Sequence, residues 1–197
     1  MRTIQTEVFK YDELSDKAKE KARDWYREAS QGDDFYAECV IDDAKEIAKL
    51  FGLEIDQIYY SGFSSQGDGA SFTGHYRYQK GACKAVEAYA PRDTELHRIC
   101  KDLQAIQRKS FYRISAHITH SGRYQHEYSM GFDYMLNGEY LYTTMAFESD
   151  LTEALRDYAR WIYKRLESEY DYQNSDEVVE ETIIANEYEF LKSGDIA

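Results

Sequence analysis

Hydrophobic residues recur every three or four positions at both ends of this chain and every second position in its middle. The first spacing marks one face of an α-helix, and the second marks one face of a β-strand. Helices are therefore expected at residues 12–30, 34–51, 94–109, 150–170 and, with a weaker pattern, 175–191. Strands are expected at residues 55–63, 71–79, 110–119, 124–136 and 139–147.

This order predicts an α+β fold in which helices pack mainly on one face of an antiparallel sheet of four to five strands. Ser15 and Asp93 stand where N-caps of two helices are expected. Ser121-Gly122 and Asn137-Gly138 are typical of hairpin turns. Because no internal repeat or linker divides the sequence, a single domain over residues 1–197 is expected.

Composition places the chain among globular proteins, since 43% of its residues are hydrophobic and 15% are aromatic. Its three cysteines are an odd number without Cys-x-x-Cys spacing, so reduced thiols are expected rather than disulfides or a zinc site. The first residues lack the apolar core of a signal peptide, and no apolar run approaches the length of a membrane helix. These features predict a cytoplasmic protein that does not bind membranes.

Acidic residues are concentrated towards the two ends of the chain. The formal net charge is −13, of which residues 1–54 carry −5, residues 55–147 carry +1 and residues 148–197 carry −9. Direct binding to nucleic acid is not expected, because such binding depends on Lys and Arg. Two interpretations of the acidity remain: it keeps the protein soluble, or it forms an acidic face that competes with nucleic acid for a partner's basic groove.

The segment Ser61–Ala70 (SGFSSQGDGA) has three glycines, two neighbouring serines, Gln66 and Asp68. Glycines permit positive φ and close backbone approach, which a ligand-binding loop requires. It is not a phosphate-binding loop, since it lacks the terminal Gly-Lys-Ser/Thr, and it has too few oxygen ligands for an EF-hand. The segment is either a ligand-binding loop or a hairpin loop that uses Ser and Asp for local hydrogen bonds.

Histidines gather around the second predicted hairpin. A two-residue turn at Ser121-Gly122 would place His117 opposite His126, which suggests a metal site with Glu127 nearby. Glu127 points to the other face of the strand, however, so exposed polar strand positions explain these residues better and no metal is expected. Neither a nucleophile elbow nor a cofactor motif is present, so no catalytic residue and no cofactor are assigned.

Several segments occur in order along most of the chain. They are Phe9 with ELS at 13–15 and AKEKA at 18–22, IDDA at 41–44, SGFSSQGDGASFTG at 61–74, SGRY at 121–124, HEYSM at 126–130 and ANEYEF at 185–190, of which the SQGDGA core is the most specific. Together they resemble a family of small phage, prophage and plasmid accessory proteins. Some proteins of that type are associated with blocking host defence, including as anti-CRISPR proteins. The resemblance implies an accessory protein that acts in the cytoplasm of a host cell.

The leading hypothesis is a binding protein that inhibits a host nucleic-acid-handling complex by occupying its basic surface. Acidic helices would steer the encounter, and tyrosine-rich loops would supply contact area. A small enzyme with a site near Ser64–Asp68 and a regulatory or scaffold protein of the phage cycle are the alternatives. The residues expected to contact a partner protein or ribonucleoprotein are Ser64, Ser65, Gln66, Asp68, Arg123, Tyr124, Glu167, Glu169, Asp171, Glu177, Glu180 and Glu181.

Overall fold

In the computed structural model, the described residues are 6–30, 32, 34–141, 143 and 145–197. Their contacts group them into two compact units, and the boundaries between the units fall inside two long helices. The sheet unit comprises Glu38–Glu167. The acidic unit comprises the chain up to Ala37 together with Ser168–Ala197. The prediction of a single domain over residues 1–197 stays a prediction.

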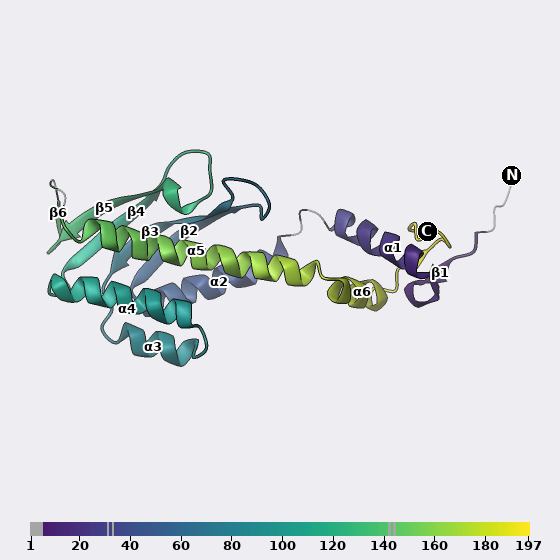
Figure 1. Cartoon of the computed structure of the whole chain (residues 1–197), viewed down its shortest axis with the longest axis horizontal. Helices are drawn as coiled ribbons and strands as arrows, with labels where there is room; N and C mark the ends of the chain where they lie inside the picture. The colour runs from purple at the N-terminus through teal and green to yellow at the C-terminus, as the bar shows by residue number, and fades with distance from the viewer. Residues whose placement is uncertain (1–5, 31, 33, 142, 144) are drawn as a thin grey trace. The chain divides into compact units, whose positions relative to one another are not determined.

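A five-stranded antiparallel sheet forms the centre of the sheet unit, in the spatial order β2-β3-β4-β5-β6 (Figure 1). Each strand therefore pairs with its neighbour in sequence, which confirms the predicted α+β class and the antiparallel sheet. The strands are β2 (Leu53–Ser61), β3 (Gly69–Arg77), β4 (Ile114–His120), β5 (Met130–Leu136) and β6 (Glu139–Tyr140).

Helices cover one face of this sheet (Figure 1). They are α2 (Phe35–Leu50), α4 (Thr94–Lys109) and α5 (Glu148–Gln173), and the short helix α3 (Ala82–Tyr89) packs against α4. The covered face is apolar, because Phe72 and Tyr76 of β3 alternate with polar residues and are almost fully buried. Tyr158 of α5 lies against Phe72, at 6.1 Å between ring centroids, and against Phe51, at 4.9 Å. The core thus lies between the sheet and α5.

A β-bulge bends the edge strand β2. The pairing of β2 with β3 shifts between Ile55 and Gln57, which leaves Asp56 without a partner in the register. Gly74 of β3 lies opposite Ile55, and a Cβ atom there would lie 2.0 Å from the carbonyl oxygen of Glu54. Only glycine allows the backbones to approach this closely.

The predicted boundaries of α4 are confirmed, and the Asp93 side chain accepts a hydrogen bond from the backbone N–H of Leu96, as an N-cap does.

The short helix α3 was not predicted from the sequence. The last two strands were predicted too long: β5 begins only at Met130, and within 139–147 the structure describes a strand at Glu139–Tyr140 alone, while residues 142 and 144 lie outside the described residues.

The acidic unit joins segments from the two ends of the sequence. Its own elements are β1 (Phe9–Lys10), a 3₁₀ turn at Tyr11–Glu13, α1 (Asp16–Ala29), α6 (Asp176–Ala185) and β7 (Glu189–Phe190). β1 pairs antiparallel with β7, and Phe9 lies opposite Phe190. Leu14, Ala18 and Ala22 form a small core with Val179, Ile183 and Phe190. The segment predicted as one helix over 175–191 therefore ends earlier and continues as a strand.

The two units differ in net charge. Residues 1–37 and 168–197 contain 18 acidic and 8 basic residues, a net charge of −10. Residues 38–167 contain 19 acidic and 16 basic residues, a net charge of −3. Among the described residues, no helix combines the length and the apolar character that crossing a membrane requires.

Candidate functional site

Two loops meet at one end of the five-stranded sheet. Residues 62–68 connect β2 to β3, and residues 121–129 connect β4 to β5. A Cβ atom on Gly69 would lie 3.0 Å from Cβ of His126, and one on Gly67 would lie 3.6 Å from Cδ1 of Tyr124. The glycines of the first loop therefore permit the second loop to pack against it. We call residues 62–69 and 121–129 together the two-loop surface.

Asp68 organises the first loop from within. Its carboxylate accepts hydrogen bonds from the backbone N–H groups of Ser64 (3.1 Å) and Ser65 (2.6 Å) and from the hydroxyl of Ser61 (3.3 Å). Gly62, at φ 25°, lies so close that an added Cβ would be 2.6 Å from the Asp68 carboxylate. Both features favour the interpretation of this segment as a hairpin loop built on local hydrogen bonds.

Replacing Asp68 by Ala is expected to lower the free energy of unfolding of the sheet unit by about 1–2 kcal/mol, because two backbone donors and one hydroxyl lose their acceptor. Asp68→Asn keeps one acceptor oxygen and should lose less. Urea denaturation of the three proteins measures the difference. Equal stability of all three would show that the carboxylate does not hold the loop.

The second loop exposes aromatic rings beside cations. Tyr124 and Tyr128 are 53% and 64% exposed. The Arg123 guanidinium lies 4.8 Å from the centroid of the Tyr124 ring and donates to its hydroxyl. Ser64, Ser65 and Gln66 are exposed on the neighbouring loop. The structure thus brings the predicted residues of both loops onto one surface of exposed rings, hydroxyls and an amide.

Helix α5 supports the two-loop surface with three residues that the sequence interpretation did not include. The Tyr163 hydroxyl donates to the carbonyl oxygen of Gly62 (2.9 Å), and Nε of Arg156 donates to the carbonyl oxygen of Glu127 (3.1 Å). Arg160 forms an ion pair with the Glu127 carboxylate at 3.3 Å. The three lie four and three positions apart, which places them on one face of the predicted helix. That spacing shows that they share a face, but it does not show which loops the face contacts.

Arg160 also belongs to a network of charges centred on Asp157. Arg98 of α4 donates to the Asp157 carboxylate at 2.8 Å, and Arg160 donates to it as well. Burial acts to raise the pKa of Asp157, but the hydrogen bonds from the two arginines outweigh it and the pKa lies below its ordinary value. The network therefore links α4, α5 and the two-loop surface through an ionised carboxylate.

A lowered pKa in the folded state means that Asp157 stabilises the fold above its unfolded pKa of about 3.9 and loses this contribution as the pH falls through the folded value. We expect Asp157→Asn to be less stable than the unchanged protein at pH 7. We also expect the difference to shrink as the pH falls below about 4. Denaturation midpoints across this pH range measure both effects, and a difference that does not change with pH would contradict them.

The predicted pairing of His117 with His126 is wrong. Nine residues rather than two separate β4 from β5, so His117 lies opposite Asp133 and stacks with His75 of β3 at 4.7 Å between ring centroids. His126 instead accepts the backbone N–H of Tyr128 through Nδ1. In the part of the chain that the structure describes, no three His, Cys, Asp or Glu side chains are grouped as a metal site requires.

In the acidic unit, ion pairs join α1 to α6. Arg23 binds Glu180 at 2.6 Å, and Arg27 binds Asp176 at 2.5 Å. The Tyr11 hydroxyl donates to Glu180 as well, and burial, with this hydrogen bond, raises the pKa of Tyr11 to about 12. Glu180 is therefore paired within the acidic unit and is not a free surface charge.

The remaining predicted carboxylates are differently placed. Glu177 and Glu181 are exposed on α6, one turn apart, and Asp171 is exposed near the end of α5. None of these three has an ion-pair partner among the described residues. Glu169 accepts from Gln173, and Glu167 is the last residue of the sheet unit. The structure therefore does not gather all twelve predicted residues into one site.

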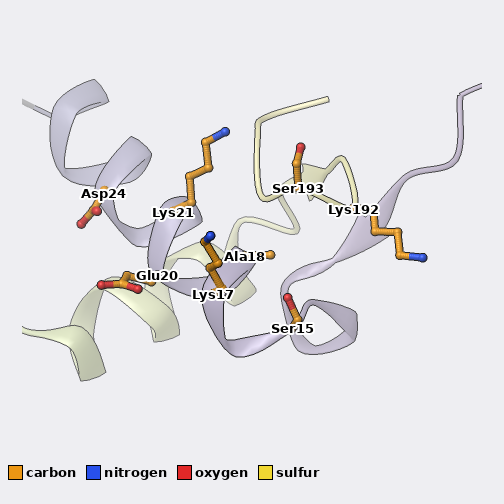
Figure 2. A pocket seen from close by; sticks show the side chains of 8 residues that line it. All are labelled: Ser15, Lys17, Ala18, Glu20, Lys21, Asp24, Lys192 and Ser193. Carbon is orange, nitrogen blue, oxygen red and sulfur yellow. The ribbon is translucent and has the colours of Figure 1, made fainter.

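An open pocket of about 520 Å³ lies in the acidic unit beside α1 (Figure 2). Lys17, Lys21 and Lys192 border it, together with Ser15 and Ser193. Lys21 is already paired with Asp195 at 2.6 Å. Glu20 and Asp24 also line the pocket, so its lining carries both signs of charge.

Comparison with known proteins gives one result. No curated protein and no solved structure matches the chain. A family model described as a domain of unknown function, DUF8835, matches residues 36–176. The matched range covers the whole five-stranded sheet, the two-loop surface and α5, and it ends at the first residue of α6. Since this is more than two thirds of the sequence, the chain belongs to the DUF8835 family.

Proposed function

We propose that this chain is a binding protein of phage or mobile-element type that inhibits a host defence complex by occupying its basic nucleic-acid-binding surface, as an anti-CRISPR protein does. The phage origin, and with it action in the host cytoplasm, rests on the sequence resemblance. The mode of action rests on the charge and contacts of the acidic unit.

The observation that carries this proposal is the convergence of two acidic segments, far apart in sequence, in one small unit of net charge −10. A high density of carboxylates repels nucleic acid and attracts the cationic grooves that bind it. Ion pairs with Arg23 and Arg27 use some of the carboxylates to hold the unit together. Asp171, Glu177 and Glu181 remain available to a partner.

Contact area lies beside these charges. Ile184 is 46% exposed and follows Glu181 by three positions on α6, and Tyr172 is 60% exposed beside Asp171. Exposed aromatic and aliphatic side chains next to carboxylates suit a partner groove in which cations border apolar surface, as in many nucleic-acid-binding channels.

The test is competition between this protein and nucleic acid for purified defence complexes. The unchanged protein should displace bound DNA or RNA from its target complex, and its affinity should fall as salt is raised. The triple variant Asp171→Lys, Glu177→Lys, Glu181→Lys should bind at least about tenfold more weakly. A matched control, Asp42→Lys, Glu54→Lys, Asp56→Lys, reverses three exposed carboxylates of the sheet unit and should bind like the unchanged protein.

The proposal fails if no defence complex is bound at low salt, or if the triple variant and the control lose binding equally. Affinity capture from host cells followed by mass spectrometry would then address the alternative of a scaffold or regulatory protein of the phage cycle. The enzyme hypothesis centred on Ser64–Asp68 stays a prediction. The hydrogen bonds of Asp68 give no support to it, because they account for this carboxylate by loop geometry.

A further inference from the structure

The connection from α4 to β4 places two consecutive bulky residues in the left-handed region of backbone conformation. Phe111 has φ 53° and Tyr112 has φ 61°. Non-glycine residues avoid this region, and the conformation costs roughly 1–2 kcal/mol per residue. Surrounding contacts must therefore hold the connection in place.

Gln107 supplies those contacts. It is fully buried, its side-chain amide donates to the carbonyl oxygen of Ile114 (2.8 Å), and its side-chain oxygen accepts from the N–H of Ile114 (3.3 Å). Its own backbone carbonyl accepts the N–H of Tyr112 at 2.7 Å. The side chain of Gln107 thus holds the segment at Ile114, and its backbone carbonyl holds the segment at Tyr112.

This shape turns Phe111 outwards. Its side chain is 78% exposed to solvent. The Arg113 guanidinium lies 5.7 Å from the centroid of the Phe111 ring. Tyr112 is 43% exposed, and its ring lies 4.4 Å from that of Tyr78, which follows β3. The contact between the tyrosines brings residues 77–80 alongside residues 108–113.

These two segments contain only positive charge. Their five cations are all exposed, neither segment holds a carboxylate, and the only ion pair that the structure describes for them joins Lys109 to Asp150 at 3.9 Å. The cations are Arg77, Lys80, Arg108, Lys109 and Arg113. We call residues 77–80 and 108–113 the basic aromatic patch. It lies at the opposite end of the sheet from the two-loop surface, as the antiparallel strand order requires.

We propose that the basic aromatic patch binds single-stranded nucleic acid. Clustered cations bind phosphates by releasing counterions, and an exposed aromatic ring stacks with an unpaired base. An acidic protein segment would satisfy the cations but would leave the exposed ring of Phe111 without a stacking partner. The inference does not depend on the proposed function, which concerns the acidic unit.

It departs from the expectation drawn from net charge. That expectation counted charge over long stretches of sequence, in which the five cations are offset by distant carboxylates. The two halves of the patch are separated by about 30 residues, so no continuous run of Lys and Arg signals it. At physiological salt, charges separated by more than about 8 Å are largely screened, so local charge decides binding.

Fluorescence anisotropy with a labelled oligothymidylate of about 20 nucleotides tests the proposal, at salt concentrations from about 50 to 200 mM. Binding should weaken steeply as salt rises. The double variant Arg108→Gln, Arg113→Gln should lower the slope of log affinity against log salt by about 1.4, since each phosphate contact contributes about 0.7 for single strands. Phe111→Ala should reduce affinity about tenfold with little change in that slope.

Matched controls separate the patch from the rest of the unit. Arg92→Gln and Tyr89→Ala remove an exposed cation and an exposed ring near the other end of α4, and both should bind like the unchanged protein. Phe111→Gly suits the positive φ, so it should keep or raise stability while it weakens binding as Phe111→Ala does. A fold defect therefore cannot explain the loss.

The proposal is overturned if the oligonucleotide does not bind at about 50 mM salt, or if Phe111→Ala binds like the unchanged protein. Equally effective competition by polyglutamate, which has charge but no bases, would also overturn it. That result would assign the patch to acidic protein segments instead.

Discussion

Replacing Gly74 by Ala is expected to destabilise the sheet unit by about 3 kcal/mol or more. The new Cβ would lie 2.0 Å from the carbonyl oxygen of Glu54, a distance at which the two backbones must separate. Separation would break the pairing of β2 with β3 next to the bulge and disturb the edge of the sheet. Urea denaturation monitored by tryptophan fluorescence measures the loss.

Gly81 provides the matched control. It also has a positive φ, 86°, but nothing lies within 4 Å of an added Cβ atom. Gly81→Ala should therefore show only the conformational cost of a left-handed residue, about 1 kcal/mol. If the two variants lose equal stability, close backbone approach at Gly74 is not what requires glycine there.

Replacing Tyr158 by Ala should destabilise the sheet unit by about 4 kcal/mol, the usual cost of removing a large aromatic ring from a core. The side chain is completely buried and contacts Phe51, Phe72 and Trp161. Its hydroxyl donates to the carbonyl oxygen of Ala44 at 2.5 Å, which ties α5 to α2. Burial raises the pKa of Tyr158 well above its ordinary value, so the hydroxyl keeps its proton.

Tyr158→Phe separates the contributions of the ring and the hydroxyl. It keeps the packing and loses one hydrogen bond, so a loss of about 1 kcal/mol is expected. Differential scanning calorimetry of the two variants gives the comparison. Losses of similar size would mean that the hydrogen bond to Ala44, rather than ring packing, dominates at this position.

Periodicity alone predicted the fold class and most helices. Asp93 has the chemistry of an N-cap, and α4 begins and ends where predicted. The helix α3 was missed because its eight residues are too few to show a clear repeat. The β4–β5 hairpin was mispredicted because Ser121-Gly122 suits a tight turn, whereas the packing of His126 against Gly69 favours a longer loop. Such contacts between distant residues leave no local signal.

The candidate site was also predicted only in part, because contacts between distant residues leave no local signal in the sequence. The residues of both loops were identified, since glycine, Ser and Asp clusters are visible in sequence, and the structure brings them together. Their support by Arg156 and Tyr163 depends on where α5 crosses the sheet, which periodicity does not specify. The internal role of Glu180 depends on Arg23, more than 150 positions away. Charge counting could not distinguish such a paired carboxylate from an exposed one.

The pairing of β1 with β7 implies an order of folding, in which the sheet unit folds before the acidic unit. Phe9 and Phe190 lie opposite each other, and all of residues 38–167 separates the two halves of the acidic unit. Closing a flexible loop of that length costs roughly 4 kcal/mol in chain entropy, a large fraction of what a small unit can supply. A folded sheet unit removes most of that cost in advance, because Tyr158 already holds α5 against α2. The two halves of the acidic unit are also synthesised at different times, so residues 9–29 wait for their partners until the intervening chain has been made. The folded sheet unit should therefore stabilise the acidic unit, whereas the acidic unit should contribute little to the stability of the sheet unit.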